Sequence, residues 1–321
     1  MKNLLITILL ITVLNCNSKK TTVENKITNS TVPTLKETVK AGLEYLASDA
    51  LAGRNTGTPG IEMAASYIET IFKKNNIKPY FETYRDSFKL EEITGYNIIG
   101  YVEGHDPQLK NEFVILGAHY DHIGKAKAVN GDSIANGAND DASGTIAVIE
   151  WAKHFSKIKN NKRSLLFTLY SAEEMGLKGS EHLAKRLKKD NLNVYTMINF
   201  EMIGVPRAEN ESMAYITGYK KSNMPDKLNH YAGDTLVGFL QQAKAYNLFK
   251  RSDNYPFYNE FTIPAHAIST FDFTNFDYYH HVDDEADKMD FDHITGFINK
   301  MIPALTGMIN APTQEIALLD E

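Results

Sequence analysis

Cysteine is nearly absent from this sequence, with one thiol in 321 residues. A single cysteine excludes an internal disulfide framework, and it excludes a zinc site built from several thiolates. An excess of positive charge is also missing, because 34 Lys and Arg face 40 Asp and Glu, for a formal net charge of −6. This balance argues against nucleic acid as a partner. No internal repeat and no Pro/Gly-rich hinge divides the chain, so one domain is the simplest reading.

Long apolar runs are confined to the N-terminus. Lys2 precedes an apolar run at residues 4–14, which has the length of a signal peptide and is too short for a comfortable membrane span. The run ends at Asn15-Cys16 and resembles a bacterial lipoprotein signal, in which the cysteine is lipidated after cleavage, although Asn15 replaces the usual small residue. A plain secretory signal cut nearby is the alternative. The expected product is exported, and is either secreted or anchored through Cys16 alone, facing the periplasm or cell surface.

The rest of the chain divides into a tether and a folded body. Residues 16–32 are rich in Ser, Thr, Asn and Lys and read as a flexible tether after a signal peptide at residues 1–15. Residues 33–321 have globular composition and are expected to form a single domain, present as a monomer.

Helical and strand patterns alternate along this body. Helices are expected at residues 34–47, 61–76, 142–155, 179–189, 235–246 and 291–309, with Pro303 kinking or interrupting the last one. Strand-length apolar runs occur at residues 96–102, 113–118, 165–170, 195–200 and 263–269. Most of these runs are continuously hydrophobic, as in strands covered on both faces. The pattern predicts a layered α/β domain.

Polar side chains follow three of these predicted strands. His119 and Asp121 come after the run at 113–118, Glu173 and Glu174 after the next, and Glu201 after the third. Ligands of open α/β sheets bind at the carboxyl ends of the strands, so these side chains are expected at one rim.

Each motif also has a purely structural explanation. Asp140 and Asp141 precede a predicted helix, where such residues often cap free amides, and a Glu-Glu pair is usually solvated surface. A carboxylate that ends an apolar run, as Glu201 does, is costly to bury without a partner. A divalent cation accounts for all of these residues together.

Four segments carry a family resemblance. Residues 117–121, 137–144, 171–180 and 278–280 resemble, in order and spacing, the family 28 metallopeptidases, which are di-zinc aminopeptidases related to glutamate carboxypeptidases and glutaminyl cyclases. Residues 46–54 and 57–60 are similar to the helical start of that family. The resemblance implies a three-layer zinc-peptidase fold, in which a mixed, mostly parallel central sheet carries helices on both faces.

The resemblance also implies roles for individual residues. His119 and Glu201 would hold one metal ion, Glu174 and His280 the other, and Asp140 would bridge the two. Two zinc ions per chain are expected, although cobalt or manganese could use the same ligands.

Three further residues are expected to serve catalysis. Glu173 would be the general base, Asp121 would accept the second ring N–H of His119, and Tyr279 would donate to the developing oxyanion. An ordinary turn aspartate and a packing tyrosine are the alternatives for the last two. The other histidines are assigned to surface or structural positions, and they are His105, His122, His154, His182, His230, His266, His281 and His293.

Two positions depart from the family pattern: Glu201 stands where most relatives carry aspartate, and Asn254 where histidine is usual. The expected activity is that of a zinc-dependent exopeptidase acting on peptides with a free N-terminus. A glutaminyl cyclase-like acyltransferase, a carboxypeptidase of the same superfamily and a non-catalytic binding module are the alternatives.

Overall fold

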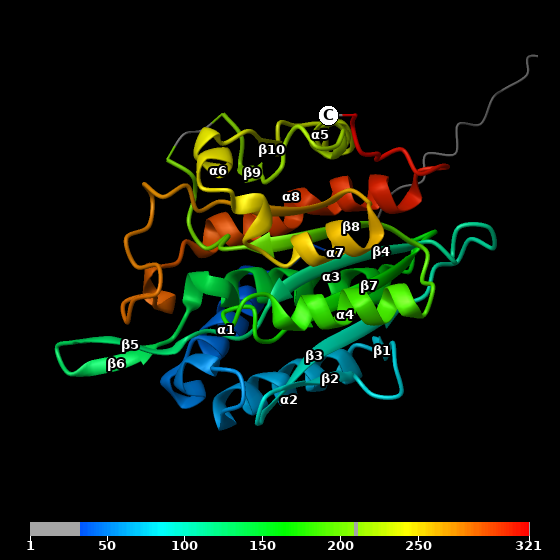
Figure 1. The fold of residues 1–321 in the computed structure, drawn as a ribbon. Coiled ribbons are helices and arrows are strands. Elements are labelled where there is room, and N and C mark those ends of the chain that lie inside the picture. The colour runs from blue at the N-terminus through cyan, green and yellow to red at the C-terminus, as the bar shows by residue number, and fades with distance from the viewer. Residues whose placement is uncertain (1–32, 209–210, 321) are drawn as a thin grey trace, which may run out of the picture. The chain divides into compact units, whose positions relative to one another are not determined.

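Most strands of the protein pair into one nine-stranded sheet, seen in Figure 1. The structure is a computed structural model that describes residues 33–208 and 211–320. The predicted signal peptide and the predicted tether, with Cys16, lie outside the described residues. The described residues fall within one compact unit, Val32–Glu321.

Four neighbouring parallel strands form the centre of this sheet. Their order is β7 (Ser164–Tyr170), β4 (Phe113–His119), β8 (Val194–Glu201) and β11 (Ala265–Ser269). Antiparallel pairing starts on either side, at β3 (Ile93–Val102) next to β7 and at β9 (Ala214–Ile216) next to β11. The outer strands are β1 (Lys78–Pro79), β2 (Arg85–Leu90) and β10 (Val237–Gly238). All five predicted strands are therefore present, in a mixed sheet with a parallel centre.

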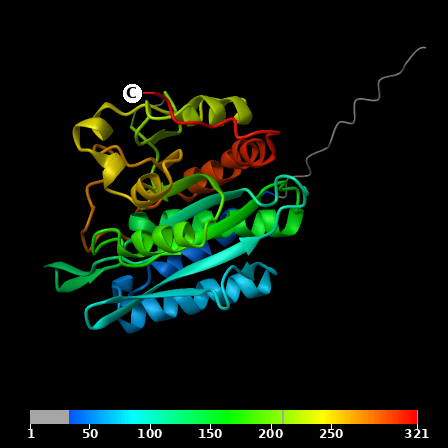
Figure 2. The same cartoon turned by 45° about the vertical axis from the view of Figure 1, so that its right-hand side comes forward.

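Helices cover both faces of the sheet (Figure 2). One face packs against α1 (Lys36–Leu46), α2 (Pro59–Lys74), α3 (Gly144–Ile158) and α8 (Phe291–Asn310), with α5 (Met224–Ala232) against α8. The other face packs against α4 (Lys178–Lys189) and α7 (Asn254–Phe261). Each face of the sheet has its own hydrophobic core. Along β4, Val114 and Leu116 belong to the core on the α3 face and Ile115 to the core on the α4 face, because successive side chains of a strand point to opposite faces. The predicted three-layer α/β fold is confirmed.

Two predicted elements differ from the structure. The helix expected at 235–246 is only α6 (Gln241–Ala245), because Val237 and Gly238 pair with β9 as β10. Helix α8 continues through Pro303 without interruption; this residue is exposed, so water can reach the carbonyl group that loses its helical partner.

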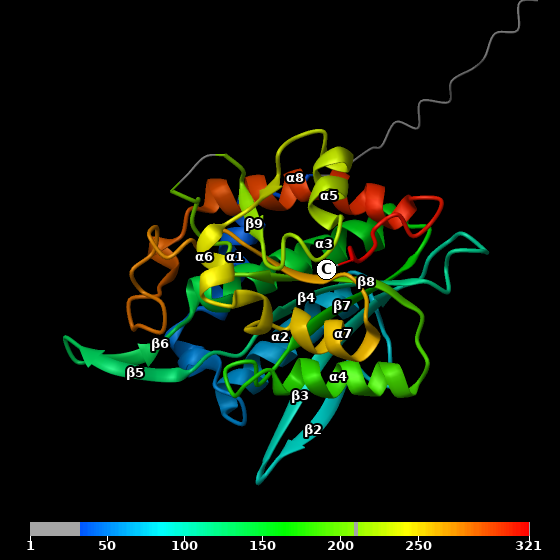
Figure 3. The same cartoon turned by 45° about the horizontal axis from the view of Figure 1, so that its top comes forward.

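Short elements gather where the parallel strands end. A hairpin of β5 (Gly124–Val129) and β6 (Asp132–Ala135) projects from the body, as Figure 3 shows. The turn η2 (Ala138–Ser143) links this hairpin to α3, and η1 (Asp49–Arg54) packs against the hairpin. Two further turns are η3 (Leu248–Lys250) and η4 (Ala286–Lys288).

None of the helices within residues 33–208 and 211–320 is long and apolar enough to cross a membrane.

Candidate metal centre

The predicted site residues meet at the edge of the sheet where the parallel strands finish. His119 is the last residue of β4 and Glu201 is the last residue of β8, its parallel neighbour. Glu173 and Glu174 follow β7, which pairs with the other side of β4. Segments far apart in the sequence therefore deliver their polar side chains to one rim, as the sequence predicts.

His119, Asp140 and Glu201 form a first group of possible metal ligands, whose ligand atoms all lie within 4.8 Å of one another. Nε2 of His119 lies 3.2 Å from Oδ1 of Asp140 and 3.1 Å from Oε1 of Glu201. The other oxygen of Glu201 accepts a hydrogen bond of 2.8 Å from the Ser252 hydroxyl and a weaker one from the Asn199 amide. These contacts orient the Glu201 side chain.

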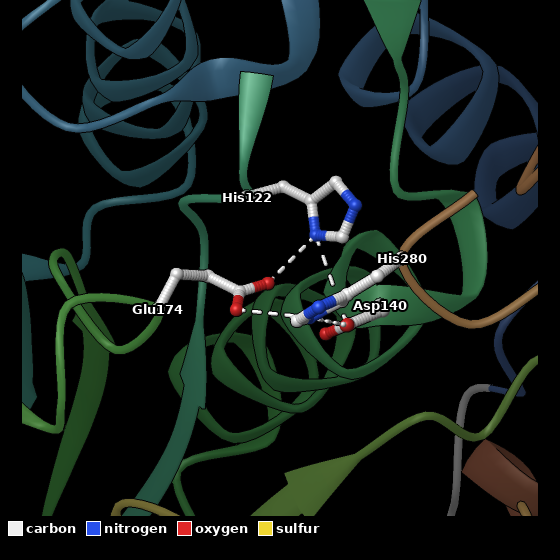
Figure 4. Close-up of side chains that lie close together, drawn as sticks. All are labelled: His122, Asp140, Glu174 and His280. Carbon is white, nitrogen blue, oxygen red and sulfur yellow. Dashed lines mark ion pairs between the residues drawn. The ribbon is translucent and has the colours of Figure 1, made fainter. Parts of the chain in front are cut away.

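Asp140, Glu174 and His280 belong to a second group, which also includes His122 (Figure 4). Nε2 of His280 lies 3.0 Å from Oε2 of Glu174 and 3.3 Å from Oδ2 of Asp140. Asp140 thus turns one oxygen to each group, which is the arrangement needed for a bridging carboxylate. The structure brings together all five residues for which the resemblance implies metal binding.

His122 lies in the second group, although the sequence analysis assigned it to a surface or structural position. Its side chain is fully buried, and its Nδ1 lies 2.9 Å from Oε1 of Glu174. This burial excludes a surface position for His122, and the other seven histidines set aside lie in neither group. Its position three residues after His119, just past a strand end, was the one available signal.

Asp121 contacts His119 differently from the prediction. Nδ1 of His119 lies 3.2 Å from the backbone carbonyl oxygen of Asp121 and 3.6 Å from its carboxylate, which is longer than a hydrogen bond. Donation from Nδ1 leaves Nε2 free to face the carboxylates of the first group. The Asp121 carboxylate instead accepts hydrogen bonds from the Glu173 backbone N–H (3.2 Å) and the Thr56 hydroxyl (3.3 Å). Asp121 therefore links His119 to the loop that carries Glu173.

The backbone around Asp140 is held by two other buried aspartates. Asp284 accepts the backbone N–H groups of Asn139 and Asp140 at 2.7 and 3.1 Å. Asp141 accepts the backbone N–H of Gly144 at the start of α3, at 3.1 Å. Asp141 therefore binds the backbone at the start of α3, whereas Asp140 faces both ligand groups.

Glu173 and Tyr279 line a cavity of about 480 Å³ beside the two groups. Burial raises the pKa of Glu173 well above its usual range; His119 opposes this shift and the carboxylate of Glu201 adds to it. Tyr279 is 46% exposed at the surface, and partial burial together with the neighbouring carboxylates raises the pKa of its phenol, which keeps its proton. The ring of Tyr279 stacks on His280, with the ring centroids 4.0 Å apart. Neither residue belongs to a metal-ligand group, and both line the same cavity.

Comparison with known proteins identifies the family. The sequence profile of peptidase family M28 matches residues 97–304, more than half of the chain. The chain belongs to peptidase family M28. The matched residues include every member of the two ligand groups.

Individual relatives of this M28 chain agree with the assignment. A protein of Trichophyton verrucosum described as a probable leucine aminopeptidase is 28% identical over 249 residues, which cover 74% of this chain and 62% of that protein. The aligned part thus covers less than two thirds of that relative's length.

Solved structures share the M28 fold at low sequence identity. An aminopeptidase from Aneurinibacillus sp. strain AM-1 has a TM-score of 0.65 and 17% identity, over 90% of this chain and 96% of that one. A glutaminyl cyclase of Fimbriiglobus ruber has a TM-score of 0.67 and 20% identity, over 87% of this chain and 96% of that one. Both bear out the predicted zinc-peptidase architecture.

The M28 ligand groups have the donor chemistry of zinc sites. Imidazole nitrogens and carboxylate oxygens are typical catalytic zinc ligands, and no thiolate is required. Burial would lower the pKa of His280, yet the adjoining carboxylates of Asp140 and Glu174 outweigh this effect and raise it to about 10. The same concentration of negative charge favours a divalent cation, whose binding displaces protons from its ligands. The residues present therefore fit zinc.

Proposed function

We propose that this M28 chain is a zinc-dependent exopeptidase that holds two zinc ions and hydrolyses the N-terminal peptide bond of peptides. The observation that carries the proposal is the pair of ligand groups sharing Asp140, with Glu173 beside them in a cavity. A non-catalytic binding module would not need a buried carboxylate next to two metal positions.

Zinc, Glu173 and Tyr279 would have separate roles in hydrolysis. Zinc bound by the two groups would polarise the substrate carbonyl and lower the pKa of a water molecule. Glu173 would accept a proton from the attacking water and later pass it to the amine of the departing peptide. Its raised pKa suits a carboxyl that must hold a proton between these steps. The phenol of Tyr279 would donate a hydrogen bond to the carbonyl oxygen as negative charge develops on it.

The cavity favours peptides with an apolar first residue. Tyr215, Phe271 and Phe273 line it together with Tyr279, and the rings of Phe271 and Phe273 lie 4.6 Å apart between centroids. An aromatic wall of this kind buries an apolar side chain well. Carboxylates at the metal groups would attract the free amino group of the peptide.

A peptide assay tests the proposal directly. The protein is incubated with a library of free-amine peptides and with the same peptides acetylated at the N-terminus, and the products are identified by mass. Stepwise loss of N-terminal residues from the free-amine set alone is expected, and a chelator should abolish it until zinc is added back. Loss of ammonia from N-terminal glutamine would indicate a cyclase, and loss of C-terminal residues a carboxypeptidase; either result would contradict the proposal.

We also propose that the protein is exported and lipid-anchored through Cys16, which lies outside the described residues. The support is the apolar run at residues 4–14, which ends just before this one cysteine. Cys16→Ser should move the protein from the membrane fraction to the soluble fraction. An unchanged fractionation would favour simple secretion.

A further inference from the structure

The ring of His122 lies among the ligands of the second group although no role is implied for it by the family resemblance. Its Nδ1 is 2.9 Å from Oε1 of Glu174 and 3.7 Å from Oδ2 of Asp140. Figure 4 shows that this nitrogen points to the same space as the Glu174 carboxylate, the Asp140 carboxylate and the His280 ring. The side chain is completely buried, so water does not compete for it from outside.

The atoms that face one another here lack hydrogen bonds. Among the described residues, neither ring nitrogen of His122 has a hydrogen-bond partner of acceptable geometry, and the same is true of Oε1 of Glu174 and Nε2 of His280. Nδ1 of His122 and Nε2 of His280 instead approach the Glu174 carboxylate as ion pairs, at 2.9 and 3.0 Å, without hydrogen-bond geometry, and buried polar atoms that lack hydrogen bonds are rare in folded proteins. Three such residues facing one space are the arrangement that a cation between them would satisfy.

The surrounding backbone holds the His122 ring in place. Gly137 has a positive φ of 61°, and a Cβ at this position would lie 2.5 Å from Cγ of His122. Only glycine therefore lets the loop before Asp140 pack this closely on the ring. The ring also meets His280 edge to face, with 5.6 Å between centroids.

We propose that His122 is a fourth protein ligand of the metal position formed by Asp140, Glu174 and His280, and that the two metal positions therefore differ in affinity. The second group then supplies two imidazoles and two carboxylates, whereas the first supplies one imidazole and two carboxylates. This inference rests on the proposed two-metal function.

The difference in the number of protein ligands predicts the order in which the two metal positions fill. Four protein donors complete the usual coordination of zinc, whereas three leave a position for water or substrate. The position with His122 fills first and releases its ion slowly. The position with His119 and Glu201 fills second and exchanges its ion more readily.

The test is a zinc titration against a competing chelator, with three proteins compared. The wild type should bind two equivalents in two separate steps. His122→Asn should weaken the tight step by more than 100-fold, beyond the roughly 10–100-fold effect of losing a residue that only hydrogen-bonds to a ligand. His182→Asn is the matched control, because this partly exposed histidine pairs with Asp86 away from the site, and it should leave both steps unchanged.

A measurement on the wild type tests the same inference without requiring that any variant folds correctly. X-ray absorption of the protein loaded with one equivalent of zinc should count two imidazole ligands per ion, from His122 and His280. A count of one imidazole ligand would overturn the inference, and so would a His122→Asn effect of 100-fold or less on the tight step. If the wild type still bound two equivalents of zinc, the proposed function would remain supported. Failure of the wild type to bind zinc at all would overturn both.

Discussion

Arg54 places a buried positive charge beside the metal centre, and its replacement by methionine should strongly destabilise the protein. Its side chain is only 1% exposed. The guanidinium donates four hydrogen bonds of 2.5–3.0 Å to backbone carbonyl groups, and the acceptors are Leu46, Tyr120, Asn136 and Gly137. These bonds tie the N-terminal helices to the end of β4 and to the loop that leads to Asp140.

The size of the effect follows from these contacts. A hydrogen bond to a charged group contributes about 1.5–3 kcal/mol, so four amount to roughly 6–12 kcal/mol before the cost of burying the cation is subtracted. That cost is several kcal/mol, and removal of one partner from a buried charged network typically costs about 3–5 kcal/mol. We expect Arg54→Met to lower the free energy of unfolding by about 4 kcal/mol.

Urea unfolding provides the assay, since Trp151 is the one tryptophan of the chain and is buried against Phe200. Chelator in the buffer separates the effect on folding from any effect on metal binding. The control is Arg85→Met, because Arg85 forms ion pairs with Glu62 and Glu69 but has a side chain 27% exposed. It should cost about 1 kcal/mol or less. If Arg54→Met cost no more than Arg85→Met, the reasoning from buried carbonyl partners would be refuted.

Two further predictions concern His266 on β11 and Ser252, which contacts Glu201. Burial lowers the pKa of His266 to about 4, while its ring nitrogens contact the Thr217 carbonyl and the Ser222 hydroxyl at 2.7 Å each. Because the folded pKa lies below the unfolded value of about 6.5, stability present above pH 6.5 should be lost as the pH falls towards 4, by about 3 kcal/mol in urea unfolding. His266→Asn should remove this slope, and an unchanged slope would show that another group causes it. Ser252→Ala should weaken zinc binding by about 10–100-fold in a chelator competition, because the hydroxyl orients Glu201; unchanged affinity would show that the contact is dispensable.

The strand ends account for most of what could be predicted from the sequence. His119 and Glu201 end apolar runs, and parallel strands place their carboxyl ends at one edge of a sheet, so their meeting follows from a general rule. His280 belongs to no such pattern, because it lies in a loop after β11, and only the family resemblance indicated it. In the structure His280 lies in the second ligand group, whereas its neighbour His281 contacts Asp283 and lies in neither group.

Other features depended on tertiary contacts that sequence patterns do not contain. His122 enters the second group because the chain turns after β4, and neither its spacing nor its neighbours fix that direction. Val237 and Gly238 become a strand by pairing with β9, against the helical periodicity of their segment. Helix α7 was not predicted, and its eight residues with a proline give little periodic signal.

Metal content and turnover of Glu173→Gln, measured on the same preparation, test the central claim most directly. The account predicts two zinc ions per chain, as in the wild type, and a turnover of N-terminal peptide bonds reduced by about 10²–10⁴-fold. Glu181→Gln on α4, where the side chain is 41% exposed, is the matched control and should keep full activity. Wild-type turnover in Glu173→Gln with both zinc ions bound would contradict the assignment of Glu173 as the proton-transferring group.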